Sequence, residues 1–332
     1  ALWRKPLSRY VEFLTDYYIM KQTLYFGNPA YLSMRNSQLV IKMPEVENAK
    51  GISDEMKQSS ITTKPIEDIG ILIIDHKQIT LTSALISALL DNNCAVVTCN
   101  AQSLPTGLLL PLSGNTTQAE RFTRQIQASL PLKKQLWAQT VKRKILNQAA
   151  VLSNFTDAET ACMKVWAETV RSGDPDNLEA RAAAYYWKVL FPHIPDFTRD
   201  REGVPPNNLL NYGYAILRAI VARSLVASGL LPTLGIHHHN RYNAYCLADD
   251  IMEPYRPFVD ALVLNTMQRH SDIQQLTKPI KYDLLSVAYL DTFIDGACRP
   301  LTNAVAQTTA SLYKCFANEI RQIAYPDYEP NE

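Results

Sequence analysis

The amino-acid sequence predicts an α+β protein in which a β-rich N-terminal region is followed by a helical C-terminal region. Short apolar and β-branched runs, separated by turn residues, occupy roughly the first third of the chain. After the turn sequence at 113–117, the spacing of apolar residues changes from two to about 3.6, the helical period. Strands and helices do not alternate along the chain, so a doubly wound parallel sheet is not predicted.

The N-terminal elements are predicted from short apolar runs bounded by turn residues. The predicted strands are 24–26, 38–43, 70–75, 78–82, 94–98 and 107–112. One helix is predicted at about 83–90, between two of these runs. The polar segment between Pro44 and Ile66 has few apolar side chains to bury, so we expect a loop there.

The C-terminal helices are predicted from apolar stripes and terminal signals. One stripe consists of Trp137, Val141, Ile145 and Ala149. A helix through Glu179 is expected to begin with Asp176 or Asn177 as its N-cap and to end at Phe191. The segment 207–228 is apolar on most sides and ends before Gly229, which predicts a central buried helix. Further helices are predicted at about 246–267 and 283–324, followed by a frayed tail at 326–332.

Composition excludes several classes of protein. The 332 residues are 47% hydrophobic, which is typical of a globular protein with a sizeable core. No apolar run approaches the roughly 20 residues that span a bilayer, and no secretory leader is evident, so we expect a cytoplasmic protein without a membrane partner. The six cysteines form no CxxC pair, which favours a reducing compartment. Dinucleotide and P-loop motifs are absent.

The charges are unevenly distributed although the net charge is only +1. Between Arg121 and Thr156 there are seven basic residues and no acidic residue. These residues are Arg121, Arg124, Lys133, Lys134, Lys142, Arg143 and Lys144. A basic face of this kind can bind a phosphate backbone, and the alternative is an ordinary solvated helix surface.

The segment 235–257 combines three adjacent histidines with Asp249, Asp250 and Glu253. Spacings of three and four would place both aspartates on the face of Glu253, and such acids need a neutralising cation unless they only cap a helix. Pro254 and Pro257 predict a kink beside Glu253. Carboxylates with one imidazole suit Mg²⁺ or Mn²⁺, whereas two histidines with one glutamate suit zinc. Glu179 is a candidate third acid, or simply a first-turn glutamate.

Seven segments, in order, resemble the CRISPR adaptation integrase family, the CRISPR-associated endonucleases of spacer acquisition. These segments are 23–33, 66–76, 95–100, 107–115, 176–187, 207–219 and 235–257. The resemblance covers about 20–320 and is greatest to the form found in type II-like systems. It implies an N-terminal β-sandwich-like domain at 20–112 and an all-α catalytic domain at 113–325.

The resemblance also implies a site. Glu179 matches the family glutamate of N-x-E-A-R-A-A, Glu253 matches that of M-E-P, and His238 matches the second histidine of G-I-H-H. His239 extends the histidine run, so the choice between His238 and His239 stays open. Asp250 and Arg256 match supporting positions, an acid and a base that contacts phosphate.

The resemblance implies a metal-dependent reaction on DNA. With Mg²⁺ or Mn²⁺, the 3′-OH of a captured DNA fragment attacks a phosphodiester of the CRISPR repeat, and water in its place gives hydrolysis. The expected partners are DNA, a second copy of the chain as a homodimer, and a second small CRISPR-associated adaptation protein. The basic residues expected to contact DNA are Arg121, Arg124, Lys142, Arg143 and Lys144.

Two other functions are compatible with the same residues. One is a metal-dependent nuclease or mobile-element integrase outside CRISPR, and the other is a non-catalytic DNA-binding scaffold subunit. The first 19 residues precede the resemblance and carry apolar side chains at nearly helical spacing. We expect them to be the linker or tail of an upstream domain, with a fused reverse transcriptase as one candidate. A native N-terminal extension is the alternative.

Overall fold

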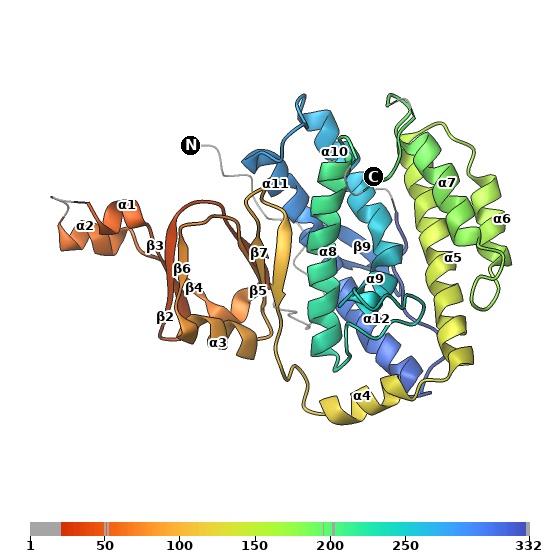
Figure 1. Cartoon of the computed structure of the whole chain (residues 1–332), viewed down its shortest axis with the longest axis horizontal. Helices are drawn as coiled ribbons and strands as arrows, with labels where there is room; N and C mark the ends of the chain where they lie inside the picture. Colours follow the sequence, from red (N-terminus) through yellow and green to blue (C-terminus); the bar gives the residue numbers. More distant parts are fainter. Residues whose placement is uncertain (1–20, 50, 52, 195, 201–202, 330–332) are drawn as a thin grey trace, which may run out of the picture.

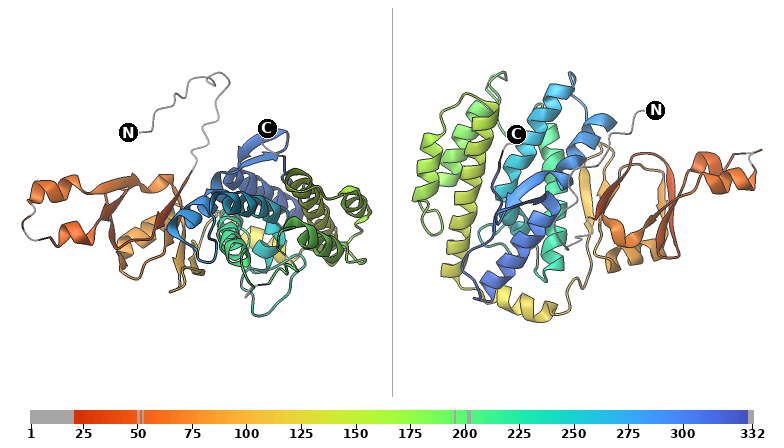
Figure 2. Two further views of the ribbon diagram at one scale, coloured as in Figure 1. Left: turned by 90° about the horizontal axis from the view of Figure 1, so that it is seen from above. Right: turned by 180° about the vertical axis from the view of Figure 1, so that it is seen from behind.

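The computed structural model describes residues 21–49, 51, 53–194, 196–200 and 203–329. In this part of the chain, two β-sheets precede a group of packed helices (Figure 1), which confirms the predicted α+β class. The strand-rich part extends from one side of the helical part (Figure 2). The expectations for residues 1–19 lie outside the described residues.

The two N-terminal sheets each contain four strands. The first has the order β1-β5-β7-β8, with β1, β5 and β7 parallel and β8 antiparallel to β7. Its strands are β1 (Gln22–Phe26), β5 (Ile69–Ile74), β7 (Ala95–Cys99) and β8 (Pro105–Leu109). The second has the order β4-β3-β2-β6, with strands β2 (Ala30–Arg35), β3 (Gln38–Lys42), β4 (Thr62–Pro65) and β6 (Ile79–Leu81). Helix α3 (Ser83–Asp91) follows β6, and the Thr82 hydroxyl accepts the Leu85 N–H at its start.

In the N-terminal region, two strands and three short helices were not predicted. The segment 44–66, expected to be a loop, contains α1 (Pro44–Glu47), α2 (Asp54–Ser59), β4 and the start of the 3₁₀ turn η1 (Ile66–Asp68). The sequence of β4 has two β-branched threonines but no apolar run, and its backbone pairs with the edge of β3, where Val40 faces Thr63. Strand β2 was also missed, although it alternates buried Ala30 and Leu32 with exposed Tyr31.

The first sheet contributes to two hydrophobic cores because successive side chains of a strand point to opposite faces. Leu72 and Val96 pack into the core between the two sheets. Ile71, Ile73 and Val97 face the other way and join the core of the helical region. The first sheet therefore packs against the second sheet on one face and against the helical region on the other.

The helical region begins after β8. Its elements are α4 (Gln118–Ile126), α5 (Leu130–Phe155), α6 (Ala161–Thr169), α7 (Leu178–Leu190), α8 (Asn207–Ala227), α9 (Cys246–Met252), η2 (Glu253–Tyr255), α10 (Arg256–Arg269), α11 (Lys278–Leu285), η3 (Ser286–Tyr289), β9 (Asp291–Ile294), β10 (Ala297–Pro300) and α12 (Leu301–Phe316). The predicted stripe of α5 is buried, as expected. The helical pattern changes beside Glu253, where a kink was expected, to the short 3₁₀ turn η2 between α9 and α10.

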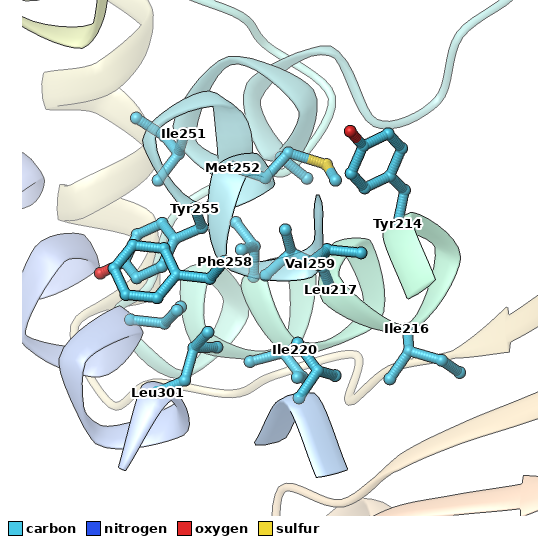
Figure 3. Close-up of a cluster of buried hydrophobic side chains, with 14 of the residues drawn as sticks. Tyr214, Ile216, Leu217, Ile220, Ile251, Met252, Tyr255, Phe258, Val259 and Leu301 are labelled. Carbon is cyan, nitrogen blue, oxygen red and sulfur yellow. The ribbon is translucent and has the colours of Figure 1, made fainter. Parts of the chain in front are cut away.

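Helix α8 lies at the centre of the helical region, as predicted (Figure 1). It packs against α9 and α10 through Leu217, Met252 and Val259 (Figure 3). A Cβ on Gly213 would lie 2.5 Å from Val259 Cγ1, so only glycine permits this close approach of α8 and α10. Among the described helices, α8 alone is long and apolar enough to span a membrane, and 78% of its apolar window is buried inside the protein.

The C-terminal end departs from one expectation. The predicted helix at 283–324 is interrupted by an antiparallel hairpin, β9 and β10, whose turn places Asp295 and Gly296 at positive φ. An Asp-Gly pair between short apolar runs favours such a turn, and the helical spacing around it concealed the signal. Of the tail predicted to fray at 326–332, the described part ends at residue 329, and there Asp327 bridges to Phe293 and pairs with Arg143. The C-terminal region is therefore not purely helical.

Candidate active site

Glu179 is held in the first turn of α7 by a carboxylate that precedes the helix. Asp174 accepts the backbone N–H of Leu178 at 2.9 Å and that of Glu179 at 3.0 Å. Asn177, one of the two predicted candidates, is the N-cap residue, but it adopts a left-handed conformation without a side-chain capping hydrogen bond, and Asp176 pairs with Arg171. Asp174 therefore fixes the backbone from which Glu179 projects.

Glu179 and Glu253 converge on one ammonium group. The Lys144 Nζ atom lies 2.5 Å from Glu179 Oε1 and 2.6 Å from Glu253 Oε2. On its other oxygen, Glu253 accepts the Arg256 Nε–H at 2.9 Å. The three chain segments that carry these groups are α5, α7 and the turn η2, so the predicted meeting of the two glutamates occurs across distant elements.

The charges of this cluster stabilise one another. Burial alone would raise the pKa of Glu253, but Arg256 and Lys144 outweigh it and lower that pKa to about 2. Burial likewise lowers the pKa of Lys144, and the carboxylates of Glu253 and Glu179 reverse the effect and raise it. Glu253 is therefore a carboxylate, and Lys144 an ammonium, at neutral pH.

Asp250 organises the loop that carries the histidines. Its side chain is fully buried and accepts the backbone N–H groups of Ile236 at 2.7 Å, His237 at 3.0 Å and His238 at 3.2 Å. A Cβ on Gly235 would lie 2.8 Å from Asp250 Oδ2 and 2.4 Å from the His238 carbonyl oxygen. Glycine at 235 is therefore required for the loop to wrap around this carboxylate.

Asp250 also orients the His238 ring. The His238 Nδ1–H donates to Asp250 Oδ1 at 2.5 Å, which leaves Nε2 as the nitrogen with a free lone pair. This hydrogen bond is the main reason that the pKa of His238 is raised, and the nearby Glu253 and Glu179 add to the effect against the opposing burial. Asp250 binds the ring of His238, so the geometry favours His238 over His239 as the site histidine.

Trp137, expected only as part of the α5 core stripe, supports the histidine loop. Its indole ring stacks on the His237 ring with centroids 4.0 Å apart and meets the His238 ring edge-on at 5.6 Å. Trp137 and Lys144 are two turns apart on the same helix and face the same side. Lys144 lies on the same face of the helix as the apolar residues Trp137 and Val141. This position in the sequence could have predicted that its ammonium is buried.

Two cavities continue from the site and share three residues. A cavity of about 220 Å³ is lined by Lys144, Gln148, Trp187, Arg199, Tyr214, Glu253, Arg256 and Asp260. A second, of about 660 Å³, is lined by Asn100, Leu104, Pro105, Arg199, Asn211, Tyr214, Ala215, Arg218 and Arg256. We call the pair the arginine groove. Because Arg199, Tyr214 and Arg256 line both cavities, the groove runs from Glu253 to the loop between β7 and β8.

Asp260 anchors the aromatic wall of the arginine groove. It is buried and accepts hydrogen bonds from the hydroxyls of Tyr186, at 2.9 Å, and Tyr214. Burial raises the pKa of Asp260 to about 6, although the two tyrosine hydrogen bonds oppose the shift. The guanidinium groups of Arg256 and Arg199 lie 4.7 Å and 5.2 Å from the Tyr214 ring centroid. Arg199, Tyr214 and Asp260 were not predicted from the sequence; a lone acid among the apolar residues of α10 was the available signal.

The basic residues of α5 that were predicted to contact DNA point in different directions. Lys142, Arg143 and Lys144 are consecutive, so their side chains leave the helix about 100° apart. Lys142 pairs with Glu168 at 2.9 Å, Arg143 pairs with Asp327, and Lys144 is buried in the site. Acidic residues from other elements thus neutralise a segment that has none of its own.

The remaining basic residues lie on the short helix α4. Arg121 donates to the Ser228 carbonyl oxygen at 3.0 Å and its guanidinium lies 3.9 Å from the Tyr313 ring centroid, while Arg124 is exposed. DNA contact by Arg121, Arg124, Lys142 and Arg143 stays a prediction. Asp249, expected on the face of Glu253, pairs with Arg218, whose Nε binds it at 2.6 Å.

The donor atoms at the site fit a hard divalent cation. Within the described ranges, no three acidic, histidine or cysteine side chains form a ready-made metal cage, because Lys144 separates the two glutamates. Glu253 Oε2 is nevertheless a buried oxygen that accepts no well-aligned hydrogen bond, even from Lys144. Two carboxylates and one imidazole nitrogen are the ligand types that Mg²⁺ and Mn²⁺ accept.

Two glutamates and a histidine lie at the end of the arginine groove. This combination is typical of an enzyme that acts on nucleic acid. Residues 24–278 match the model of the family described as CRISPR associated protein Cas1. The CRISPR-associated endonuclease Cas1 of Neisseria meningitidis serogroup C is 36% identical over 275 residues, covering 82% of this chain and 85% of that protein. The chain therefore belongs to the Cas1 family.

Other similarities extend over most of the chain. A CRISPR-associated endonuclease Cas1 of Pyrobaculum aerophilum is 28% identical over 75% of this chain and 88% of its own length. The fold resembles a casposase bound to integration product, with a TM-score of 0.74, 18% identity and coverage of 93% and 94% of the two chains. It also resembles a Cas6-RT-Cas1–Cas2 complex, with a TM-score of 0.68 and 18% identity, over 96% of this chain and 37% of that one.

Proposed function

We propose that this chain is a divalent-metal-dependent DNA endonuclease and integrase that inserts captured DNA into a CRISPR array. The observation that carries the proposal is the convergence of Glu179, Glu253 and His238 at the end of the arginine groove, in a member of the Cas1 family. A carboxylate pair beside arginines suits phosphodiester chemistry, because the reaction concentrates negative charge at one phosphorus.

The residues divide the chemistry between them. Glu179, Glu253 and His238 Nε2 would hold Mg²⁺ or Mn²⁺, which supplies Lewis-acid polarisation of a phosphodiester when bound. The 3′-oxygen of a captured DNA end attacks a repeat phosphorus, a new P–O bond forms, and the 3′-oxygen of the cut strand leaves and takes up a proton. Water in place of the 3′-OH gives hydrolysis. Asp250 keeps the Nε2 lone pair of His238 available throughout.

The arginine groove is the proposed path for the DNA backbone. Its basic residues come from three different parts of the helical region, and Arg218 has a side chain that is 42% exposed. Arginine binds phosphate oxygens through two parallel N–H groups and so positions a strand without reading its sequence. Lys144, which the sequence predicted to contact DNA, is buried between the two glutamates at the end of this groove.

Replacing Arg218 or Arg199 with Gln is expected to weaken binding to DNA of any sequence. The slope of log K against log salt is negative, and each lost phosphate contact reduces its magnitude by about 0.9 on duplex DNA. Fluorescence anisotropy across a salt series measures the slope, with Lys57→Gln on the distant helix α2 as a charge-matched control. If Lys142→Gln reduces the slope and both arginine variants leave it unchanged, the DNA lies along α5 instead.

The proposed assembly contains a second copy of this chain, a Cas2-type partner and DNA, in a prokaryotic cytoplasm. The supporting observation is that structures of similar fold include Cas6-RT-Cas1–Cas2 complexes. A reverse transcriptase fused upstream remains part of the proposal, with the same support.

An integration assay tests the proposed function directly. Labelled DNA fragments and a repeat-bearing plasmid are expected to give joined product with Mg²⁺ or Mn²⁺, and none above background with EDTA. The same assay separates the alternatives: equal integration into plasmids with and without the repeat would indicate an integrase outside CRISPR. Strand joining that persists in EDTA would contradict a metal-dependent reaction.

A further inference from the structure

Lys144 occupies the position between the two glutamates that a metal would share. Its Nζ atom is 2.5 Å from Glu179 and 2.6 Å from Glu253, and its side chain is only 9% exposed. The helix that carries it is fixed on the same face by the buried Trp137 and Val141. The ammonium can therefore leave the carboxylates only by rotation of its own side chain.

The cluster is electrically balanced before any metal is added. Glu179 and Glu253 contribute two negative charges, and Lys144 and Arg256 contribute two positive charges. A divalent cation on the same two carboxylates would lie within a few ångströms of the ammonium, and like charges at that distance repel strongly in a partly buried site. The ammonium and the metal therefore compete for the same oxygens.

The structure contains a second place for the ammonium. Gln148 lies one turn after Lys144 on α5, and both line the cavity of about 220 Å³. The Gln148 Oε1 atom is buried and has no hydrogen-bond partner. A buried amide oxygen without a partner is costly, and a lysine ammonium that turns into the cavity would satisfy it.

We propose that Lys144 is a resident counterion that holds Glu179 and Glu253 together without metal and turns toward Gln148 when a divalent cation binds. Lys144 thus sets the metal affinity of the site, and the inference rests on the proposed metal-dependent function. Its role is positioning, because it acts through the two glutamates.

Isothermal titration of the full chain with Mn²⁺, without DNA, tests this role. Lys144→Met is expected to bind Mn²⁺ roughly tenfold more tightly than the wild type, because the competing charge is gone. Saturating Mn²⁺ is also expected to raise the melting temperature of Lys144→Met more than that of the wild type, since its metal-free carboxylates repel one another. Lys142→Met, on the same helix but paired with Glu168, is the matched control and should keep wild-type affinity.

A second variant tests the proposed acceptor of the displaced Lys144 ammonium. Gln148→Leu removes the acceptor for the displaced ammonium, so it is expected to weaken Mn²⁺ binding while Lys144 is still present. This variant keeps the test valid if Lys144→Met does not fold, and Lys144→Arg, which retains a cation, should stay near the wild-type affinity.

The outcomes separate this inference from the proposed function. Mn²⁺ binding that requires Glu253 but is not tightened by Lys144→Met, or is unaffected by Gln148→Leu, would overturn the counterion role alone. Mn²⁺ binding that Glu253→Gln leaves unchanged would place the metal elsewhere and overturn both. Tighter binding in Lys144→Met together with weaker binding in Gln148→Leu would establish the exchange.

Discussion

Replacing Glu253 with Gln is expected to reduce strand joining about 10³-fold, a loss typical of removing one group that stabilises transition-state charge. Glu253 is the most deeply buried of the three proposed metal ligands, and its pKa of about 2 makes it fully ionised under assay conditions. Glutamine has the same shape but no charge, so it can no longer balance Lys144, Arg256 or a cation. Joining of labelled DNA ends into a repeat-bearing plasmid measures the effect.

The control for Glu253→Gln is Glu168→Gln, which makes the same chemical change at an exposed residue paired with Lys142. It should join DNA at the wild-type rate. Thermal unfolding and DNA anisotropy of Glu253→Gln separate loss of chemistry from loss of fold or of binding. A folded Glu253→Gln protein that still joins DNA at the wild-type rate would support the non-catalytic scaffold function.

Replacing Asp250 with Asn is expected to lower joining by about 10- to 100-fold, the usual cost of removing the partner that orients a metal-binding histidine. The amide has only one oxygen for the backbone N–H groups of residues 236–238 and presents an N–H to His238 Nδ1. His238 must then accept at Nδ1 and carry its proton on Nε2, the nitrogen that the proposed site requires free. Joining rate and Mn²⁺ affinity should fall together.

A second aspartate–histidine pair supplies the control for Asp250→Asn. Asp283 binds His270 Nε2 at 2.9 Å on α11, in a pair that the proposed site does not include. Asp283→Asn should therefore alter stability without lowering Mn²⁺ affinity. If Asp250→Asn is folded and binds Mn²⁺ as the wild type does, Asp250 only holds the loop and does not control the His238 tautomer.

Local patterns predicted much of the architecture. The apolar character of 207–228 identified the central helix α8, and the two prolines near Glu253 identified the break between α9 and α10. These features follow from residues within a few turns of one another, because helical period and proline geometry are local properties. Strand β4 was not predicted in this way, since its sequence has no apolar run and its backbone pairs with the edge of β3.

The same distinction applies to the site. The closeness of His238, Asp250 and Glu253 could be anticipated, because they lie within one short stretch of the chain. The identity of Glu179 came from the resemblance to a family. Arg199 and Tyr214 gave no signal, because their roles depend on a groove assembled from separate elements.

The amino-acid sequence by itself determined where strands give way to helices, which helix is buried, and which short stretch carries the histidine and two acids. Only the tertiary structure decided the electrostatics. The segment 121–156 has no acid of its own, yet the fold gives Lys142, Arg143 and Lys144 four acidic partners from other parts of the chain. The order of charged residues along a chain does not specify which of them form ion pairs, because ion pairs depend on distances that are set when distant elements pack together.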